Sequence, residues 1–72
     1  MNQMNIALDA VHGKPYAWIY IESTGERPLR QVQSWADVNR LAQEFSVEDR
    51  TIGWTIEALR WAESNWGPSP TP

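Results

Sequence analysis

The absence of cysteine constrains the fold of this chain most, because the chain has only 72 residues. A domain of this length buries only about 60% of the surface that its unfolded chain exposes, so its core alone gives limited stability. No disulfide can form, and the single histidine, His12, cannot hold a zinc ion by itself. We therefore expect one small domain over residues 1–66, without a metal or other cofactor, that gains stability from a partner or as a homodimer.

The charge of the chain argues against a dedicated nucleic-acid-binding protein. Nine acidic residues outnumber six Lys and Arg residues, and the formal net charge at pH 7 is −3. Attraction to phosphate supplies most non-specific DNA affinity and needs a basic face. The N-terminal residues lack the basic and apolar segments of a secretory signal, and no stretch approaches the ~20 apolar residues of a membrane span. We expect a soluble, cytoplasmic protein without a membrane partner.

The clearest strand is "YAWIYIES" (Tyr16–Ser23), which is dense in aromatic and β-branched residues. Alternation places one set of side chains on each face of this strand, namely Tyr16, Trp18 and Tyr20 on one and Ala17, Ile19 and Ile21 on the other. Because both faces are apolar, we expect both to be covered, at least in part.

Weaker strand patterns flank this segment. "NIALDAV" (Asn5–Val11) alternates like a strand, although Gly13 and Pro15 after it could also end a helix; we favour the strand. Residues 1–4 are expected to be loose. A turn at Thr24–Arg27 can lead into a shorter strand at Pro28–Gln33. The first half of the chain therefore predicts an antiparallel hairpin or a three-stranded meander.

Two helices are predicted in the second half. Ser34 followed by Asp37 is a capping pattern, and apolar residues recur at helical spacing as far as Phe45. A break falls near "FSVED", and a second helix is expected from about Glu48 to Asn65, with its acidic start suited to the helix dipole. The "GPSPTP" segment, residues 67–72, predicts a flexible tail with polyproline-like character at most. The expected fold class is therefore α+β.

The segment "RLAQEFSVEDRTIGWTIEAL", residues 40–59, resembles the helix-turn-helix of DeoR-type repressors and related winged-helix regulators. Their pattern is roughly L-A-x-x-F-x-V-S-x-x-T-I-x-R-D-I-x-x-L. The residues in register are Leu41, Ala42, Phe45, Val47, Thr51, Ile52, Ile56 and Leu59. The resemblance implies that the two helices pack in a helix-turn-helix-like arrangement. It also implies an alternative function, a small dimeric DNA-binding transcriptional regulator that contacts DNA through Arg50 and Arg60.

The positions that contact DNA in that family are not matched. Glu48 replaces the serine that usually opens the second helix, and Trp54-Thr55 replaces Arg-Asp. Acidic side chains at a helix N-terminus repel phosphate. The family also has a helix before the motif and a β wing after it, whereas this chain has a predicted hairpin before it and a short tail after it. DNA binding is therefore the less favoured function.

The predicted second helix has two apolar stripes. Trp54, Ala58 and Trp61 lie roughly opposite the stripe of Ile52, Ile56 and Leu59. Either the helix is sandwiched between the first helix and the face with Tyr16, Trp18 and Tyr20, or its tryptophans contact another molecule. Tryptophan is enriched at interaction hot spots. The candidate partner-binding residues are therefore Trp54, Trp61, Arg50, Glu57 and Arg60.

Catalysis is not expected. His12 lies in a predicted turn, and no nucleophile motif, phosphate-binding loop or paired metal carboxylates accompany it. We predict a small acidic, non-enzymatic protein-interaction module. By analogy with the small inhibitors that phages and mobile elements encode, it could act by occluding a larger protein complex. A further alternative is an obligate dimer whose tryptophans serve self-association alone.

Overall fold

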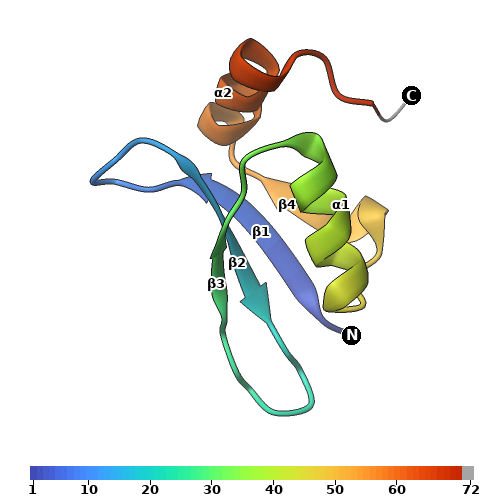
Figure 1. Ribbon diagram of the computed structural model, residues 1–72. Coiled ribbons are helices and arrows are strands. Elements are labelled where there is room, and N and C mark those ends of the chain that lie inside the picture. Colours follow the sequence, from blue (N-terminus) through green and yellow to red (C-terminus); the bar gives the residue numbers. More distant parts are fainter. Residues whose placement is uncertain (71–72) are drawn as a thin grey trace.

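The computed structural model describes residues 1–70, which form a four-stranded sheet and two α-helices (Figure 1). The chain is therefore α+β, as predicted. Its elements in order are β1 (Gln3–Leu8), β2 (Pro15–Tyr20), β3 (Leu29–Gln31), α1 (Trp35–Glu44), the 3-10 helix η1 (Asp49–Thr51), β4 (Ile52–Trp54) and α2 (Ile56–Trp66). Positions 71–72 of the predicted tail lie outside the described residues.

The sheet has the order β3-β2-β1-β4 and is mixed. β2 is antiparallel to both of its neighbours, β1 and β3, whereas the edge strand β4 runs parallel to β1. The chain passes from β3 at one edge of the sheet to β4 at the other edge through α1 (Figure 1). The sheet is therefore not the simple hairpin or meander that we expected, because a fourth strand from the second half of the sequence joins it.

The first strand begins earlier than predicted. Gln3 and Met4 belong to β1, and Met4 is completely buried, so the expectation that residues 1–4 are loose is wrong for these two. The strand interpretation of the ambiguous "NIALDAV" segment is confirmed, but β1 ends at Leu8. Beyond it, the backbone turns back through Gly13, whose φ of 64° favours glycine.

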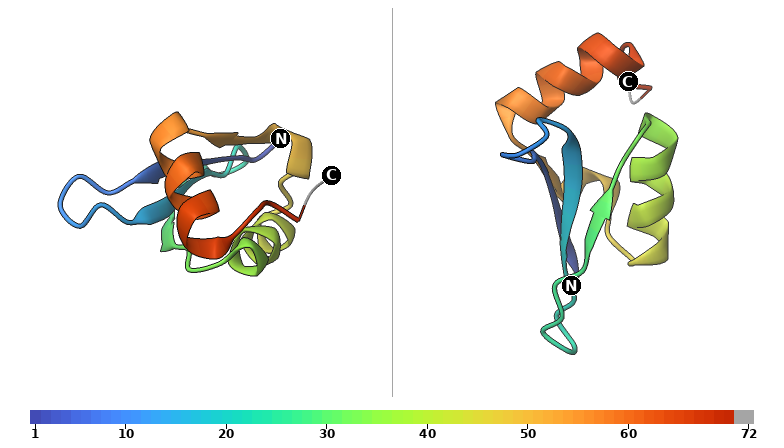
Figure 2. Two further views of the ribbon diagram at one scale, coloured as in Figure 1. Left: turned by 90° about the horizontal axis from the view of Figure 1, so that it is seen from above. Right: turned by 60° about the vertical axis from the view of Figure 1, so that its left-hand side comes forward.

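One face of the sheet forms the core. Ile6, Ala17 and Ile19 point to this face, and α1 covers it with Val38, Leu41 and Ala42, all of them buried. The other face carries no helix, as the right-hand view of Figure 2 shows. The prediction that both faces of β2 are covered at least in part holds for Tyr16 and Tyr20, which are half-buried, but Trp18 on this second face is 51% exposed and no helix covers it.

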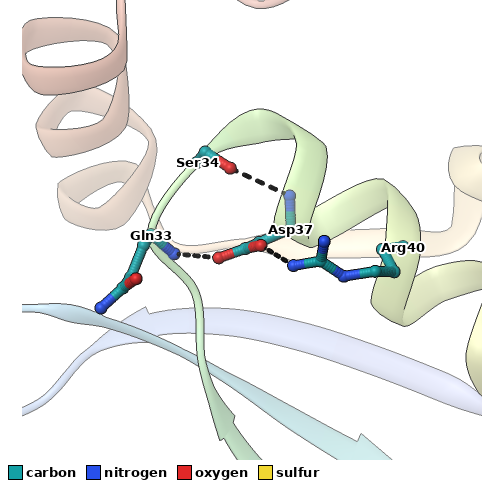
Figure 3. Close-up of polar contacts among 4 residues, drawn as sticks. All are labelled: Gln33, Ser34, Asp37 and Arg40. Carbon is teal, nitrogen blue, oxygen red and sulfur yellow. Dashed lines mark hydrogen bonds and ion pairs between the residues drawn. The ribbon is translucent and has the colours of Figure 1, made fainter.

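The start of α1 follows the predicted capping pattern (Figure 3). The Ser34 Oγ accepts a hydrogen bond of 3.1 Å from the Asp37 backbone N–H. The Asp37 carboxylate in turn accepts one of 2.9 Å from the Gln33 backbone N–H and forms an ion pair with Arg40. These bonds satisfy N–H groups that have no partner inside the helix, so the local sequence fixes where the helix begins.

The end of α1 also falls where the sequence predicted a break. The Val47 N–H donates to the Ala42 carbonyl at 2.7 Å, and the Ser46 N–H donates to Gln43. This is the Schellman pattern, in which the residue after the cap adopts a left-handed conformation. Ser46 does so with a φ of 55°. The buried side chain of Val47 then anchors the chain as it leaves the helix.

The predicted helix from Glu48 to Asn65 is wrong before Ile56. Residues after Glu48 form η1 and then β4, and α2 begins only at Ile56. Thr55 is its N-cap, since the Thr55 Oγ1 accepts a hydrogen bond of 3.1 Å from the Ala58 N–H. The backbone N–H and C=O groups of β4 pair with β1 rather than within a helix. The Thr55 N–H continues this pairing by donating to the Ile6 carbonyl at 3.0 Å.

The helix-turn-helix arrangement is not confirmed, because η1 and β4 separate the two helices in place of a tight turn. The predicted packing stripe of α2 is also wrong. Ile56 is 66% exposed, whereas Ala58 and Ala62 are completely buried. Nor is α2 sandwiched between α1 and the sheet face with Trp18; it lies at the end of the sheet where β1 and β4 end (Figures 1 and 2).

Candidate protein-binding surfaces

Four of the five tryptophans gather in one group, which we call the tryptophan cluster: Trp35, Trp54, Trp61 and Trp66. Trp66 is central. Its ring centroid lies 5.3 Å from that of Trp35, 6.4 Å from that of Trp54 and 5.8 Å from that of Trp61, and all three pairs are edge-to-face. Aromatic rings prefer this geometry at these separations, so the rings stabilise one another within the chain.

Three elements bring the cluster together. Trp35 opens α1, Trp54 ends β4, and Trp61 and Trp66 lie on α2. The parallel register pairs Trp54 with Ile6, which puts its side chain on the covered face of the sheet. The Trp35 Nε1–H donates a hydrogen bond of 3.1 Å to the Gly67 carbonyl and so ties the start of α1 to the residue after α2. The cluster joins elements that have no disulfide to hold them.

The structure separates the residues of the predicted partner-binding site. Trp54 and Trp61 are half-buried in the tryptophan cluster, whereas Arg50, Glu57 and Arg60 are exposed. Arg50 pairs with Glu48, at 3.0 Å between Arg50 Nε and a carboxylate oxygen. That any of these residues contacts a partner remains a prediction.

The uncovered side of the sheet, which we call the open sheet face, carries the fifth tryptophan. In β1 and β2 its residues alternate with buried ones, and in β3 they pair with Trp18 and Tyr16. The open sheet face consists of Gln3, Asn5, Tyr16, Trp18, Tyr20, Leu29 and Gln31. Trp18 lies between Asn5 and Leu29 in the register, and Leu29 is 44% exposed. Among residues 1–70, the indole of Trp18 makes no hydrogen bond or ring contact, unlike the four clustered indoles.

A hollow runs along the open sheet face towards the β2–β3 turn. It has a volume of about 360 Å³, and Trp18, Tyr20, Arg27 and Pro28 are among the residues that line it. The Arg27 guanidinium lies 5.2 Å from the centroid of the Tyr20 ring, a cation–π distance. Arg27 is the only charged residue in this lining, so the hollow offers aromatic surface and amide groups rather than a charged site.

Sequence reasoning missed the open sheet face as a candidate site, although a signal was present. The alternation placed Tyr16, Trp18 and Tyr20 on one face, but we expected a helix to cover it. The same alternation in β1 puts Gln3 and Asn5 on that face. Polar residues beside the aromatic row are typical of a face in contact with solvent, and they could have predicted its exposure.

The only histidine lies in the exposed turn after β1. The His12 backbone N–H donates to the Asp9 carboxylate at 2.8 Å, and the His12 Nδ1 lies 2.8 Å from the same oxygen. The backbone hydrogen bond, followed by the side-chain one, lowers the pKa of Asp9 below its ordinary value. Within residues 1–70, no three His, Asp or Glu side chains gather as metal ligands. The pair is adequately explained as the local support of a turn.

Comparison of the chain with protein-family models, curated proteins and solved structures gave no significant match. Neither helix in the described part of the chain is long and apolar enough to cross a membrane.

Proposed function

We propose that this protein is a small non-enzymatic module that binds another protein through the open sheet face. One observation carries the proposal: Trp18 is 51% exposed at the centre of a sheet face without a covering helix. Exposing a large indole to water is unfavourable, and a row of such side chains in a monomer commonly marks an interaction site.

The composition of the open sheet face favours a protein partner. The central parts of protein interfaces are depleted in charged residues and enriched in tyrosine and tryptophan. Tyr16, Trp18 and Tyr20 form such a row, with the amides of Gln3 and Asn5 beside it. These amides and the tyrosine hydroxyls can exchange hydrogen bonds with a partner, while the indole of Trp18 fills an apolar pocket in it.

Nucleic acid is the weaker candidate for the same face. Tryptophan and tyrosine can stack on bases, but that mode also needs a positive groove along the phosphate backbone. The hollow beside Trp18 is lined by one basic residue, Arg27, and the chain carries a net charge of −3. Electrostatic attraction would therefore not hold a phosphate backbone here.

We infer that the module acts by occlusion. A chain of 72 residues that covers an apolar patch on a larger protein can block the access of other molecules to that patch. This is the mode of action expected for a small inhibitor of a protein complex. The alternative function is a dimeric DNA-binding regulator that uses Arg50 and Arg60, and the experiment described next distinguishes it from the inhibitor.

Affinity capture from a lysate of the source cells would test the proposal. The baits are the wild-type chain, Trp18→Ala, Glu57→Ala/Arg60→Ala and, as a matched control, Ile56→Ala, because Ile56 is a large exposed apolar residue on another surface. We expect wild type and Ile56→Ala to retain the same protein and Trp18→Ala to lose it. Retention by Trp18→Ala with loss by Ile56→Ala or by a Glu57→Ala/Arg60→Ala variant would contradict the open sheet face and support α2. Nuclease-sensitive recovery of DNA would support the regulator.

A further inference from the structure

A second hollow lies between α1, η1 and β4, beside the tryptophan cluster. Its volume is about 240 Å³, and its apolar lining includes Trp35, Val38, Ile52 and Trp54. The chain's own Ser69 and Pro70 complete the lining on one side. The segment that the sequence singled out for its prolines therefore lies against aromatic side chains.

The backbone after α2 is held in this position. Gly67 has a φ of 83° and a ψ of −175°, a combination that glycine alone adopts readily, and it ends the helix. The Trp35 Nε1–H donates to the Gly67 carbonyl, so an indole N–H binds a main-chain carbonyl at the entry to the proline segment. Pro68 and Pro70 then follow with φ fixed near −65° by their rings.

These features match the chemistry that recognises polyproline II segments. Such segments have no internal hydrogen bonds, and they bind in grooves where aromatic rings pack on proline rings and a donor meets a main-chain carbonyl. The ring centroids of Trp35 and Trp54 lie 5.4 Å apart, and the ring planes meet at 52°. The two rings therefore form adjacent apolar surfaces that are tilted relative to each other. The Trp35 N–H is bonded to the Gly67 carbonyl, so the side-chain amide of Asn39 in the lining supplies the donor for a ligand.

We propose that the hollow formed by Trp35 and Trp54 binds a proline-containing segment of another protein in the polyproline II conformation. The chain's own Ser69 and Pro70 occupy one side of this site and compete with the ligand. The site is separate from the open sheet face, and its ligand is a short extended segment rather than a folded surface. The proposal therefore does not depend on the proposed function.

The other residues of the lining favour an uncharged ligand. Asp49 and Arg50 lie at the same hollow and carry opposite charges, and Asn39 adds a neutral amide. A phosphate or a carboxylate would meet an acid there as well as a base. A proline-rich segment has no side-chain charge to satisfy, and its carbonyl groups can accept hydrogen bonds from the Asn39 amide.

A titration of the full chain with a decaproline peptide tests the proposal. Each of the five tryptophans gives its own indole N–H signal in an NMR spectrum of the 15N-labelled protein. We expect decaproline to shift the signals of Trp35 and Trp54 and to leave that of Trp18 in place. A Gly-Ser peptide of the same length serves as the control and should shift none. Shifts confined to Trp18, no shifts, or equal shifts with the Gly-Ser peptide would each overturn the proposal.

Competition by the tail is tested with the variant Pro68→Gly/Pro70→Gly. Loss of the fixed backbone conformation should release the segment from the hollow. If the tail occupies the site for half of the time, the variant should bind decaproline about twofold more tightly, and more strongly still if the occupancy is higher. Equal affinities of wild type and variant would overturn the competition.

Discussion

The tryptophan cluster and the open sheet face use the same kind of side chain in opposite ways. In the cluster, Trp66 meets three other indoles at 5.3–6.4 Å, and Trp35 bonds to the Gly67 carbonyl. On the open sheet face, Trp18 has half of its surface in water. The difference lies in the neighbours of each region, because indoles from α1, β4 and α2 pack on one another in the cluster, whereas no helix covers the open sheet face around Trp18. A high tryptophan content therefore does not identify an interface by itself, because the tryptophans that pack inside the chain must first be distinguished from those that face solvent.

The largest effect should come from removing the centre of the cluster. Trp66→Ala deletes the ring that contacts the other three indoles, and large-to-small substitutions of packed aromatic residues cost about 3–5 kcal/mol. In a domain without disulfides, such a loss should leave the protein partly unfolded at 37 °C. Urea denaturation followed by circular dichroism measures it. A cost below about 1 kcal/mol would show that the cluster contributes little to stability.

A smaller effect is expected from Gly67→Ala. The φ of 83° and ψ of −175° are open to glycine and cost other residues about 1–3 kcal/mol. The substitution should also move the Trp35 indole N–H signal, because the Gly67 carbonyl is its acceptor. Ser64→Ala, on the exposed side of α2, is the control and should change neither quantity. An unchanged stability of Gly67→Ala would contradict a backbone conformation at this position that favours glycine.

A still smaller loss of stability should follow Trp18→Ala. Its half-exposed ring contacts no other indole in the described part of the chain, so the cost should stay below about 1 kcal/mol. The same denaturation experiment, run beside Trp66→Ala, gives the comparison directly. Equal losses for the two variants would remove the distinction between a structural cluster and a binding face.

The smallest effect concerns the turn after β1, which belongs to neither region and so serves as a reference. The pKa of Asp9 is lowered in the folded chain from its ordinary value of 3.8 by its hydrogen bonds to His12. A lowered carboxyl pKa stabilises the fold above the unfolded value, and this contribution is lost as the pH falls through the folded value. The stability difference between wild type and Asp9→Asn should therefore shrink in acid. A carboxyl 13C titration that places Asp9 at or above 3.8 would contradict this.

Local patterns predicted the elements that local chemistry controls. Ser34 and Asp37 identified the start of α1, and the alternation of Ala17, Trp18 and Ile19 identified β2. These features depend on caps and side-chain periodicity within a few residues. The strand β1 was found for the same reason, although its first residues were missed.

The fourth strand could not be found in this way. Ile52–Trp54 is too short to show alternation, and its pairing with Met4–Ile6 joins residues that are far apart in the sequence. Gly53 inside the predicted helix was the available warning, because glycine weakens helices. It lies beside Asn5 in the sheet, where a Cβ would overlap the Asn5 side-chain oxygen. The predicted binding site changed as a result. Trp54 lies in β4 and Trp61 in α2, so the helical wheel that placed both on one face of a single helix did not apply.

The most direct test of the account is the affinity of the captured protein for purified variants, measured by calorimetry. If the open sheet face is the binding surface and the tryptophan cluster is structural, Trp18→Ala should weaken binding by at least ~2 kcal/mol, or about 30-fold, while its fold stays intact. Ile56→Ala should change the affinity by less than about threefold, as expected for a residue outside the interface. Unchanged affinity of a folded Trp18→Ala variant would contradict the account.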